Sequence, residues 1–250
     1  MKGYDIMDNF KKKFEELIKN HDNTVVFNDF LAYSVDQFRI DYHQPHFHKE
    51  GYTKQEYKIF YELFEQMILS TNNKLNQGKQ WYDMLGHFYE DVVQSKWKAG
   101  DKSQFFTPVS VVEALAELTV PKTVSEDKVL TAYDSACGSS RTLLAYHVRR
   151  PFDILVGGDL DHTSCLMSVV NFVLHGCKGA IINTNSLSGE FFGAWKVNEF
   201  VDLGLPFTVE YMLDTDNLYR FIGEGLRNRA EEKIVELNPT GKETVQTTLI

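Results

Sequence analysis

Residues 129–148 read VLTAYDSACGSSRTLLAYHV, and this stretch decides the fold that the sequence predicts. An apolar run leads into Asp134, small residues around Gly138 follow, and apolar residues then recur at helical spacing. That order predicts a strand, a tight turn permitted by Gly138, and a helix capped by Ser139 or Ser140. In open α/β sheets, ligands bind at the carboxyl ends of the strands, so the turn is a candidate ligand site.

The pattern of strand, polar end and helix recurs further along the chain. Residues 154–158 form an apolar run that ends in Asp159, 25 residues after the acid of the first strand. In nucleotide-binding sheets, an acid at this place accepts hydrogen bonds from ribose hydroxyls, whereas Asp161 is expected to cap the next helix. A third strand over residues 179–184 would bring Asn185 into position to hydrogen-bond the exocyclic amine of an adenine.

Thr107 and Pro108 are expected to begin a helix ahead of the first strand. Threonine at the N-cap and proline at the first helical position are a strong start signal, and apolar residues follow at helical spacing. The free N–H groups of such a helix end can hold an anion. The alternative is a capped helix without a ligand.

The first hundred residues have the residue pattern of helices. Thr53 and Glu56 form a capping box before a long helix. Helices are expected over residues 8–20, 28–38, 54–73 and 81–97. Beyond residue 100, apolar runs alternate with helical patterns, which is typical of a parallel sheet. The expected fold class is therefore α/β, with a helical N-terminal domain (1–100), a partial Rossmann-like sheet domain (101–237) and a C-terminal tail (238–250).

The composition narrows the class of protein. The 250 residues are 43% hydrophobic and 24% charged, as in ordinary globular proteins. No apolar run approaches the ~20 residues of a membrane span and the N-terminus lacks a signal-peptide core, so we expect a cytoplasmic protein. The net charge of −9 opposes DNA binding unless a partner supplies part of the contact. Three histidines in HQPHFH, residues 43–48, favour a solvated loop over a metal site, and no metal is expected.

Four ordered stretches resemble the N6-adenine DNA methyltransferases that serve as modification subunits of type I restriction systems. They are SQFFTPVSVV (103–112), YDSACGSSRTLLA (133–145), VGGDLDHTSCLMSVVNFVLHG (156–176) and NTNSL (183–187). The family patterns are approximately G-x-F-[FY]-T-P, D-P-A-C-G-S-G, G-x-[DE]-x-D…N-x-x-L-H-G and G-[DN]-[ST]-L. Residues 83–95 also resemble the last helix of the family's N-terminal helical domain. Four motifs in order are far more specific than any one of them.

This resemblance implies a partial methyltransferase sheet with S-adenosylmethionine in its crevice. The implied cofactor contacts are Phe106, Thr107 and Pro108 at the methionine end, Asp134, Ala136 and Gly138 in the first loop, Asp159 at the ribose and Asn185 at the adenine. Two residues of the first loop depart from the family pattern. Ser135 stands in place of a proline, and Ser140 stands in place of the last glycine and adds a side chain near the ligand path.

Methyl transfer in this family depends on an N-P-P-[FY] motif after the fourth strand. The target adenine is flipped out of the duplex, and the motif's polar groups hold its amine in position for transfer. The chain lacks this motif, because its Asn238-Pro239 pair stands in a polar segment without a second proline. The expected fourth strand, residues 206–213, would cover the edge beside the first strand. Candidate polar acceptors follow it at Asp214, Asp216 and Asn217, and a turn with a helix cap is the alternative.

The last five residues, QTTLI, resemble the Q-x-x-L-[FI] peptide by which bacterial proteins dock in the sliding clamp. Gln246, Leu249 and Ile250 would make that contact, and a frayed tail is the alternative.

We therefore expect an S-adenosylmethionine-binding protein of the adenine methyltransferase family that reaches DNA through a partner subunit. Its catalysis is expected to be lost or to depend on partners. The alternative is a non-catalytic interaction or decoy module from a mobile element, which would engage restriction–modification subunits or the sliding clamp.

Overall fold

The computed structural model describes residues 6–41, 46–47, 50–93, 106–125 and 128–223. Its helices are α1 (Ile6–Leu17), α2 (Asn23–Asp36), α3 (Lys54–Asn76), α4 (Met84–Phe88), α5 (Val109–Thr119), α6 (Arg141–Arg149) and α7 (His162–His175). Its strands are β1 (Thr131–Asp134), β2 (Ile154–Asp159), β3 (Gly179–Asn185), β4 (Glu190–Val197) and β5 (Val209–Met212). A π-helical turn, Tyr89–Val93, continues α4, and residues 215–223 are helical. The α/β class is confirmed.

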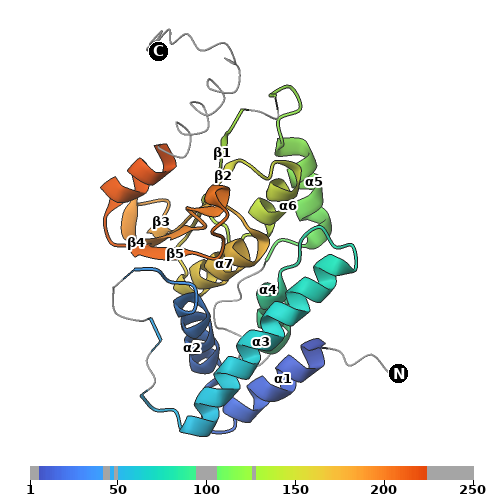
Figure 1. The fold of residues 1–250 in the computed structure, drawn as a ribbon, viewed down its shortest axis with the longest axis vertical. Helices are drawn as coiled ribbons and strands as arrows, with labels where there is room; N and C mark the ends of the chain where they lie inside the picture. The colour runs from blue at the N-terminus through green and yellow to red at the C-terminus, as the bar shows by residue number, and fades with distance from the viewer. Residues whose placement is uncertain (1–5, 42–45, 48–49, 94–105, 126–127, 224–250) are drawn as a thin grey trace.

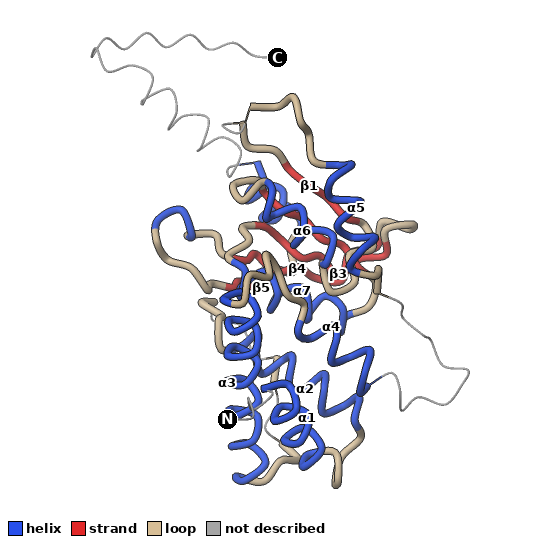
Figure 2. Tube along the Cα trace, turned by 90° about the vertical axis from the view of Figure 1, so that its right-hand side faces the viewer, coloured by secondary structure: helices blue, strands red, loops and turns tan. Residues whose placement is uncertain are grey.

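Helices α1, α2 and α3 form one end of the molecule, and the sheet lies at the other (Figures 1 and 2). These three helices together with α4 and its N-cap Asp83 are called the helical end. The predicted capping box starts α3. Thr53 Oγ1 accepts from the Glu56 N–H at 3.2 Å, and the Glu56 carboxylate accepts from the Thr53 N–H at 2.8 Å. Phe88 of α4 packs edge-on against Phe10 and Phe14 of α1. These aromatic contacts join the last helix of the helical end to the first.

The sheet has the strand order β1-β2-β3-β4-β5. Strands β1, β2 and β3 run parallel, as predicted, whereas β4 is antiparallel to both β3 and β5. The sheet is therefore mixed, with a parallel part made of the three predicted strands and an antiparallel part made of β4 and β5. β4 was not predicted, and it follows β3 through a tight turn at Gly189, which has φ of +75°. A hairpin needs only a few residues, whereas a parallel neighbour would have needed a long crossover.

The expected place of the fourth strand is wrong. Within residues 206–213, β5 forms the edge opposite to β1 instead of covering β1. The β3–β4 hairpin leads the chain away from β1, and Asn198 then turns it back by accepting from the N–H groups of Phe207 and Thr208. In the part of the chain that the structure describes, β1 pairs on one side only, with β2.

The helical end and the sheet share one buried core. A single cluster of buried side chains extends from Phe10 in α1 to Val209 in β5. β5 also exchanges backbone hydrogen bonds with the segment after α2, because the Val209 N–H donates to the Phe38 carbonyl and the Ile40 N–H donates to the Val209 carbonyl. The division near residue 100 lies outside the described residues and stays a prediction.

Candidate cofactor site

The carboxyl ends of three parallel strands bring the predicted polar residues to one edge of the sheet. Asp134 ends β1, Asp159 ends β2 and Asn185 ends β3. The predicted strand, turn and helix over residues 129–148 is confirmed as β1, its loop and α6. In sheets of this kind, the crevice at the carboxyl ends is where ligands bind.

The first loop is tightly wound. The Asp134 carboxylate accepts from the Ala136 N–H at 3.1 Å and from the Thr142 hydroxyl, so it ties the end of β1 to α6. Gly138 has φ of +55°, a conformation that side chains disfavour. A Cβ at Gly138 would come within 2.9 Å of Phe106 Cδ1. The loop therefore requires glycine here for both its backbone and the close approach of Phe106.

Asp159 joins the first loop to the end of β2. Its two carboxylate oxygens accept from the N–H of Gly138 at 2.8 Å and from the N–H of Asp161 at 2.9 Å. Burial raises the pKa of Asp159 above the usual range, although the two N–H donors oppose this effect. Asp161 caps α7 by accepting from the Ser164 N–H at 2.7 Å, as predicted.

Asn185 shapes the turn that leads into β4. Its Oδ1 accepts from the N–H groups of Leu187 and Ser188, at 3.1 and 3.3 Å. In the same turn, the Ser186 hydroxyl donates to the carbonyl of Ser135 at 2.6 Å. Because β2 lies between β1 and β3, this hydrogen bond crosses over the carboxyl end of β2. The turn after β3 therefore touches the first loop.

The helix start predicted at Thr107 and Pro108 is shifted by one residue. Helix α5 begins at Val109 with Pro108 at its N-cap, and no side chain caps it. Pro108 has an extended ψ of 143°, so its ring precedes the helix instead of forming its first turn. Thr107 is therefore not the cap, and its carbonyl accepts from Arg141 at 3.4 Å.

The predicted serine cap of α6 is wrong as well. Ser140 occupies the N-cap position with φ of +67°, and its side chain makes no cap hydrogen bond. Its hydroxyl instead donates to Ser168 on α7 at 2.8 Å, and the Ser139 hydroxyl donates to Asp83 at 2.6 Å. Both hydroxyls are buried and bind neighbouring helices, so neither is left to cap α6.

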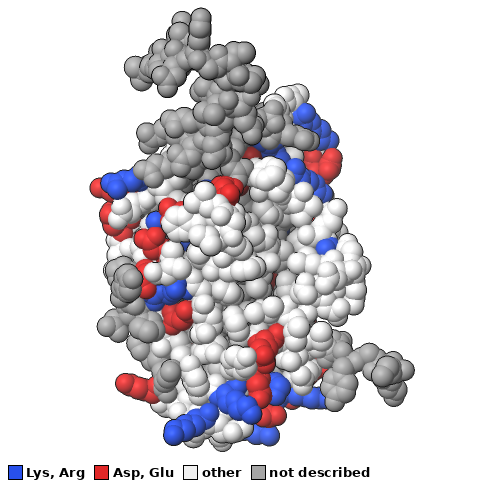
Figure 3. Space-filling view, viewed as in Figure 1, with Lys and Arg blue, Asp and Glu red and all other residues white. Residues whose placement is uncertain are grey.

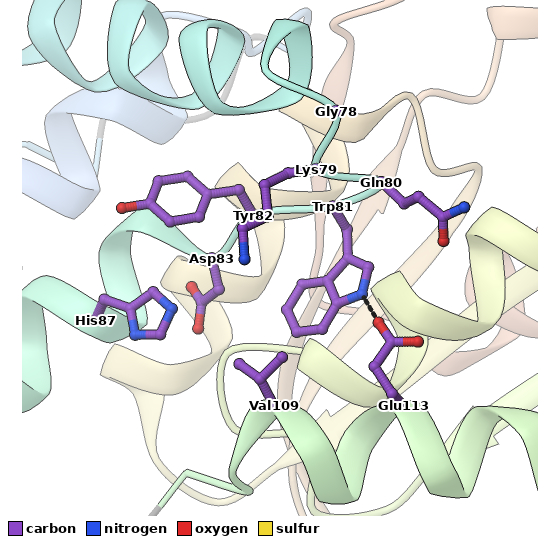
Figure 4. Close-up of a pocket in the computed structure, with 9 residues that line it drawn as sticks. All are labelled: Gly78, Lys79, Gln80, Trp81, Tyr82, Asp83, His87, Val109 and Glu113. Carbon is purple, nitrogen blue, oxygen red and sulfur yellow. Dashed lines mark hydrogen bonds between the residues drawn. The ribbon is translucent and has the colours of Figure 1, made fainter.

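Two hollows adjoin this region. The first, of about 50 Å³, brings together predicted cofactor residues, namely Phe106, Thr107, Asp134, Ala136 and Gly138. Pro108, Asp159 and Asn185 are not among its lining residues. The second, of about 170 Å³, was not predicted; Trp81, Tyr82 and His87 lie around it, with Val109 and Glu113 of α5 opposite (Figure 4).

Sequence reasoning missed Asp83 and Arg141. Asp83 is the first residue of the predicted helical stretch 83–95, but it is also fully buried and contacts the first loop. Arg141 follows the small residues of that loop, and its side chain is also buried. An arginine directly after a ligand-binding turn is the signal that would have identified it, because a buried arginine needs an acidic partner elsewhere.

The remaining candidates lie apart from the crevice. The Asp214 carboxylate accepts from the Asp216 N–H at 2.8 Å, which forms the turn before the helix of residues 215–223. This matches the alternative of a turn, at the edge of the sheet opposite to β1. The acceptor role of these residues and of Asn217 stays a prediction. Gln246, Leu249 and Ile250 lie outside the described residues.

Within the described ranges, no group of three His, Cys, Asp or Glu side chains is placed to hold a metal ion. His43 and His48 lie outside those ranges. His46 contacts Asp36 at 3.1 Å and accepts from Trp195 of β4. No described helix has the length and apolar character that a membrane crossing requires.

Comparison with known proteins gives the family. Residues 80–234 match the model of the N-6 DNA Methylase family, and the chain belongs to that family. It is similar to the type I restriction enzyme MjaVIII methylase subunit of Methanocaldococcus jannaschii, with 29% identity over 118 residues, 44% of this chain and 19% of the relative. It is also similar to the type I restriction enzyme MpnII methylase subunit of Mycoplasma pneumoniae, with 30% identity over 120 residues, 44% of this chain and 22% of the relative.

The chain spans about a fifth of the length of these relatives. The resemblance to restriction–modification methylases is confirmed, and this family implies use of S-adenosylmethionine. Membership in a methylase family favours the methyltransferase interpretation over a decoy module. Nothing in the comparisons supports docking in the sliding clamp.

Proposed function

We propose that this chain binds S-adenosylmethionine at the carboxyl ends of β1, β2 and β3, as the cofactor-binding part of a restriction–modification adenine methyltransferase. The observation that carries the proposal is the meeting of the first loop, Phe106 and Asp159 at one edge of the sheet. Gly138 contacts both partners, since its N–H binds Asp159 and a side chain at its position would strike Phe106.

The residues present fit this cofactor. Each oxygen of Asp159 accepts one N–H, and a carboxylate oxygen can accept about two hydrogen bonds, so acceptor capacity remains for ribose hydroxyls. Leu160 is 61% exposed and Leu187 is fully exposed, at the ends of β2 and β3. Their apolar surface is suited to an adenine ring. Asn185 Oδ1 already accepts two N–H groups in its turn, so it would receive the adenine amine only after that turn opens.

The crevice must open for the cofactor. The hollow of about 50 Å³ is small beside the ~300–1,000 Å³ of common ligand pockets. The Ser186 hydroxyl bonded to Ser135 spans the path from the first loop to Asn185. We propose that the cofactor displaces this contact. When bound, the cofactor supplies the methyl group, while Asp159 orients its ribose and Phe106 and Thr107 flank its methionine end.

We further propose that transfer to adenine requires an additional polypeptide segment or partner. β1 has an unpaired edge in the described structure, and helix α5, which packs against α6, exposes Val111, Leu115 and Leu118. An open strand edge and an exposed apolar helix face are both suited to a further strand and its packing. On the face seen in Figure 3, Lys and Arg lie among Asp and Glu and do not form a continuous basic surface. DNA binding would then also rely on the partner.

Isothermal titration calorimetry with S-adenosylmethionine tests the cofactor proposal. Asp159→Ala should weaken binding at least tenfold, because hydrogen bonds to a charged group contribute roughly 1.5–3 kcal/mol. Asp8→Ala, which removes an exposed acid on α1, is the matched control and should leave affinity unchanged. No binding by the intact chain, or equal affinity of both variants, would contradict the proposal.

Transfer of labelled methyl groups to adenine-containing DNA tests the second part. The expected result is no transfer by this chain alone and transfer after a complementing methylase partner is added. Robust transfer by the chain alone would overturn partner dependence. Capture of restriction–modification subunits without any cofactor binding would favour the interaction module instead.

A further inference from the structure

Asp83 is a fully buried carboxylate that links the helical end to the first loop. Its Oδ1 accepts from the Gly86 N–H at 2.8 Å and from Asn171 Nδ2 at 2.9 Å. Its Oδ2 accepts from the Ser139 hydroxyl and from Arg141 Nε, both at 2.6 Å. A carboxylate offers about four acceptor sites, so these donors saturate it. Asp83 is therefore built to hold its neighbours in place and has no capacity left for a ligand.

Arg141 extends this network to the residues before α5. Its Nη2 donates to Glu90 at 2.8 Å and its Nη1 to the Thr107 carbonyl at 3.4 Å. Its guanidinium also lies 5.1 Å from the centre of the Phe106 ring, a cation–π contact. One side chain thus contacts Phe106 and Thr107, two of the three residues that are predicted to flank the methionine end of the cofactor.

The network is more polar than packing alone would need. A buried ion pair is often no more stabilising than apolar side chains of the same volume, because both charges lose their hydration. What the ion pair provides is fixed geometry. Asp83 binds Ser139, the residue after Gly138, and Arg141 contacts Phe106, whose ring lies against Gly138. Asp83 also borders the hollow of Figure 4, so it stands between that hollow and the first loop.

We propose that Asp83 and Arg141 are positioning residues, through which the helical end holds the cofactor loop and Phe106 in a binding-competent arrangement. This inference rests on the proposed function. The family match begins at residue 80, so it includes Asp83 together with the loop. The helical end is then part of the cofactor site, although its side chains do not touch the cofactor.

Cys137 provides a test that needs no cofactor. Its thiol is buried in the loop next to Gly138, and Cys177 is buried after α7. In Asp83→Asn or Arg141→Met, alkylation of Cys137 by iodoacetamide should accelerate on the order of tenfold, because a charge-assisted hydrogen bond that closes the loop is lost. Cys177 should react at its wild-type rate. Unchanged Cys137, or equal acceleration of both thiols in a folded variant, would overturn the proposal.

Arg150 supplies a matched control. Its Nε pairs with Asp153 at 2.6 Å, the same distance as in the Arg141–Asp83 pair, and both side chains are buried. This control pair lies just before β2, at the amino end of the sheet. Arg150→Met should destabilise the fold without accelerating Cys137. If it accelerates Cys137 as much as Arg141→Met does, loss of any buried ion pair explains the effect and the positioning role fails.

Ser139→Ala keeps the test decisive if the charge-changing variants do not fold. It removes one donor to Asp83 and leaves the ion pair intact. Cys137 should then react about threefold faster, as the loss of a single hydrogen bond implies. No selective change in Ser139→Ala would overturn the proposal.

Cofactor affinity is the second readout. Calorimetry should show weaker S-adenosylmethionine binding in Arg141→Met and unchanged binding in Arg150→Met. If the intact chain binds no S-adenosylmethionine, the proposed function fails, while the Cys137 measurement still decides whether the network holds the loop. If the intact chain binds and Arg141→Met binds equally well, the positioning role is overturned and the proposed function stands.

Discussion

Gly138→Ala is the most informative single substitution in this protein, because two separate costs can be assigned to it. Gly138 has φ of +55°, and a Cβ there would approach Phe106 Cδ1 to 2.9 Å. Gly189 has φ of +75°, with no atom within 4 Å of its Cβ position. Gly189→Ala therefore carries only the backbone cost and serves as the control.

The magnitudes follow from these two environments. A left-handed backbone costs an alanine about 1–2 kcal/mol, of which the stiffer unfolded chain returns about 0.4–1 kcal/mol. Gly189→Ala should thus lose about 1 kcal/mol of unfolding free energy. Gly138→Ala must also displace Phe106, and overpacking of this kind costs about 1–3 kcal/mol more. Its total loss should be about 2–4 kcal/mol.

Urea unfolding of the two variants and the wild type measures the difference. The midpoints should shift in proportion to these losses at a constant slope, which keeps the comparison within one unfolding model. Gly138→Ala should also lose cofactor affinity, because its Cβ moves the Phe106 ring, whereas Gly189→Ala should keep it. Equal destabilisation by the two substitutions would refute the close contact between the loop and Phe106.

Three further outcomes are expected. Burial raises the pKa of Asp159, so its carboxylate takes up a proton at a higher pH than the ordinary ~3.9. Calorimetry at decreasing pH should show cofactor affinity falling at that higher pH. A loss of affinity only near the ordinary pKa would contradict this expectation. Ser186→Ala removes the hydroxyl that closes the crevice and should raise cofactor affinity by up to about tenfold, whereas weaker binding would assign the hydroxyl to the cofactor. Asp161→Ala removes the α7 cap and should cost about 1 kcal/mol in urea unfolding at unchanged affinity; a loss of affinity like that of Asp159→Ala would transfer the ribose role to it.

Local signals in the sequence predicted the elements whose partners are close along the chain. The capping box at Thr53 and the cap at Asp161 are confirmed, since a cap side chain binds an N–H three residues away. The apolar runs that end in Asp134 and Asp159 likewise gave β1 and β2. These features follow from steric and hydrogen-bond preferences within a few residues.

Features set by distant partners could not be predicted in the same way. Ser139 and Ser140 have the composition of a helix cap, but Asp83 and Ser168 compete for their hydroxyls from other helices. The pairing of β5 depends on the direction of the β3–β4 hairpin, which the apolar pattern of residues 206–213 does not encode. The tertiary contacts outweigh the local preference in each case.

The pairing of β5 with the segment after α2 has a consequence for how the protein is made. The Tyr211 N–H donates to Asp41, which joins chain positions 170 residues apart. At ~5–20 residues per second, a ribosome releases β5 roughly 10–30 s after that segment. During that interval part of the apolar surface of the nascent helical end stays unburied. Helix α2 packs against α7, which is made later, and the segment after α2 can form its hydrogen bonds with β5 only when β5 has emerged. We therefore expect synthesis that stops before β5 to yield a chain prone to aggregation.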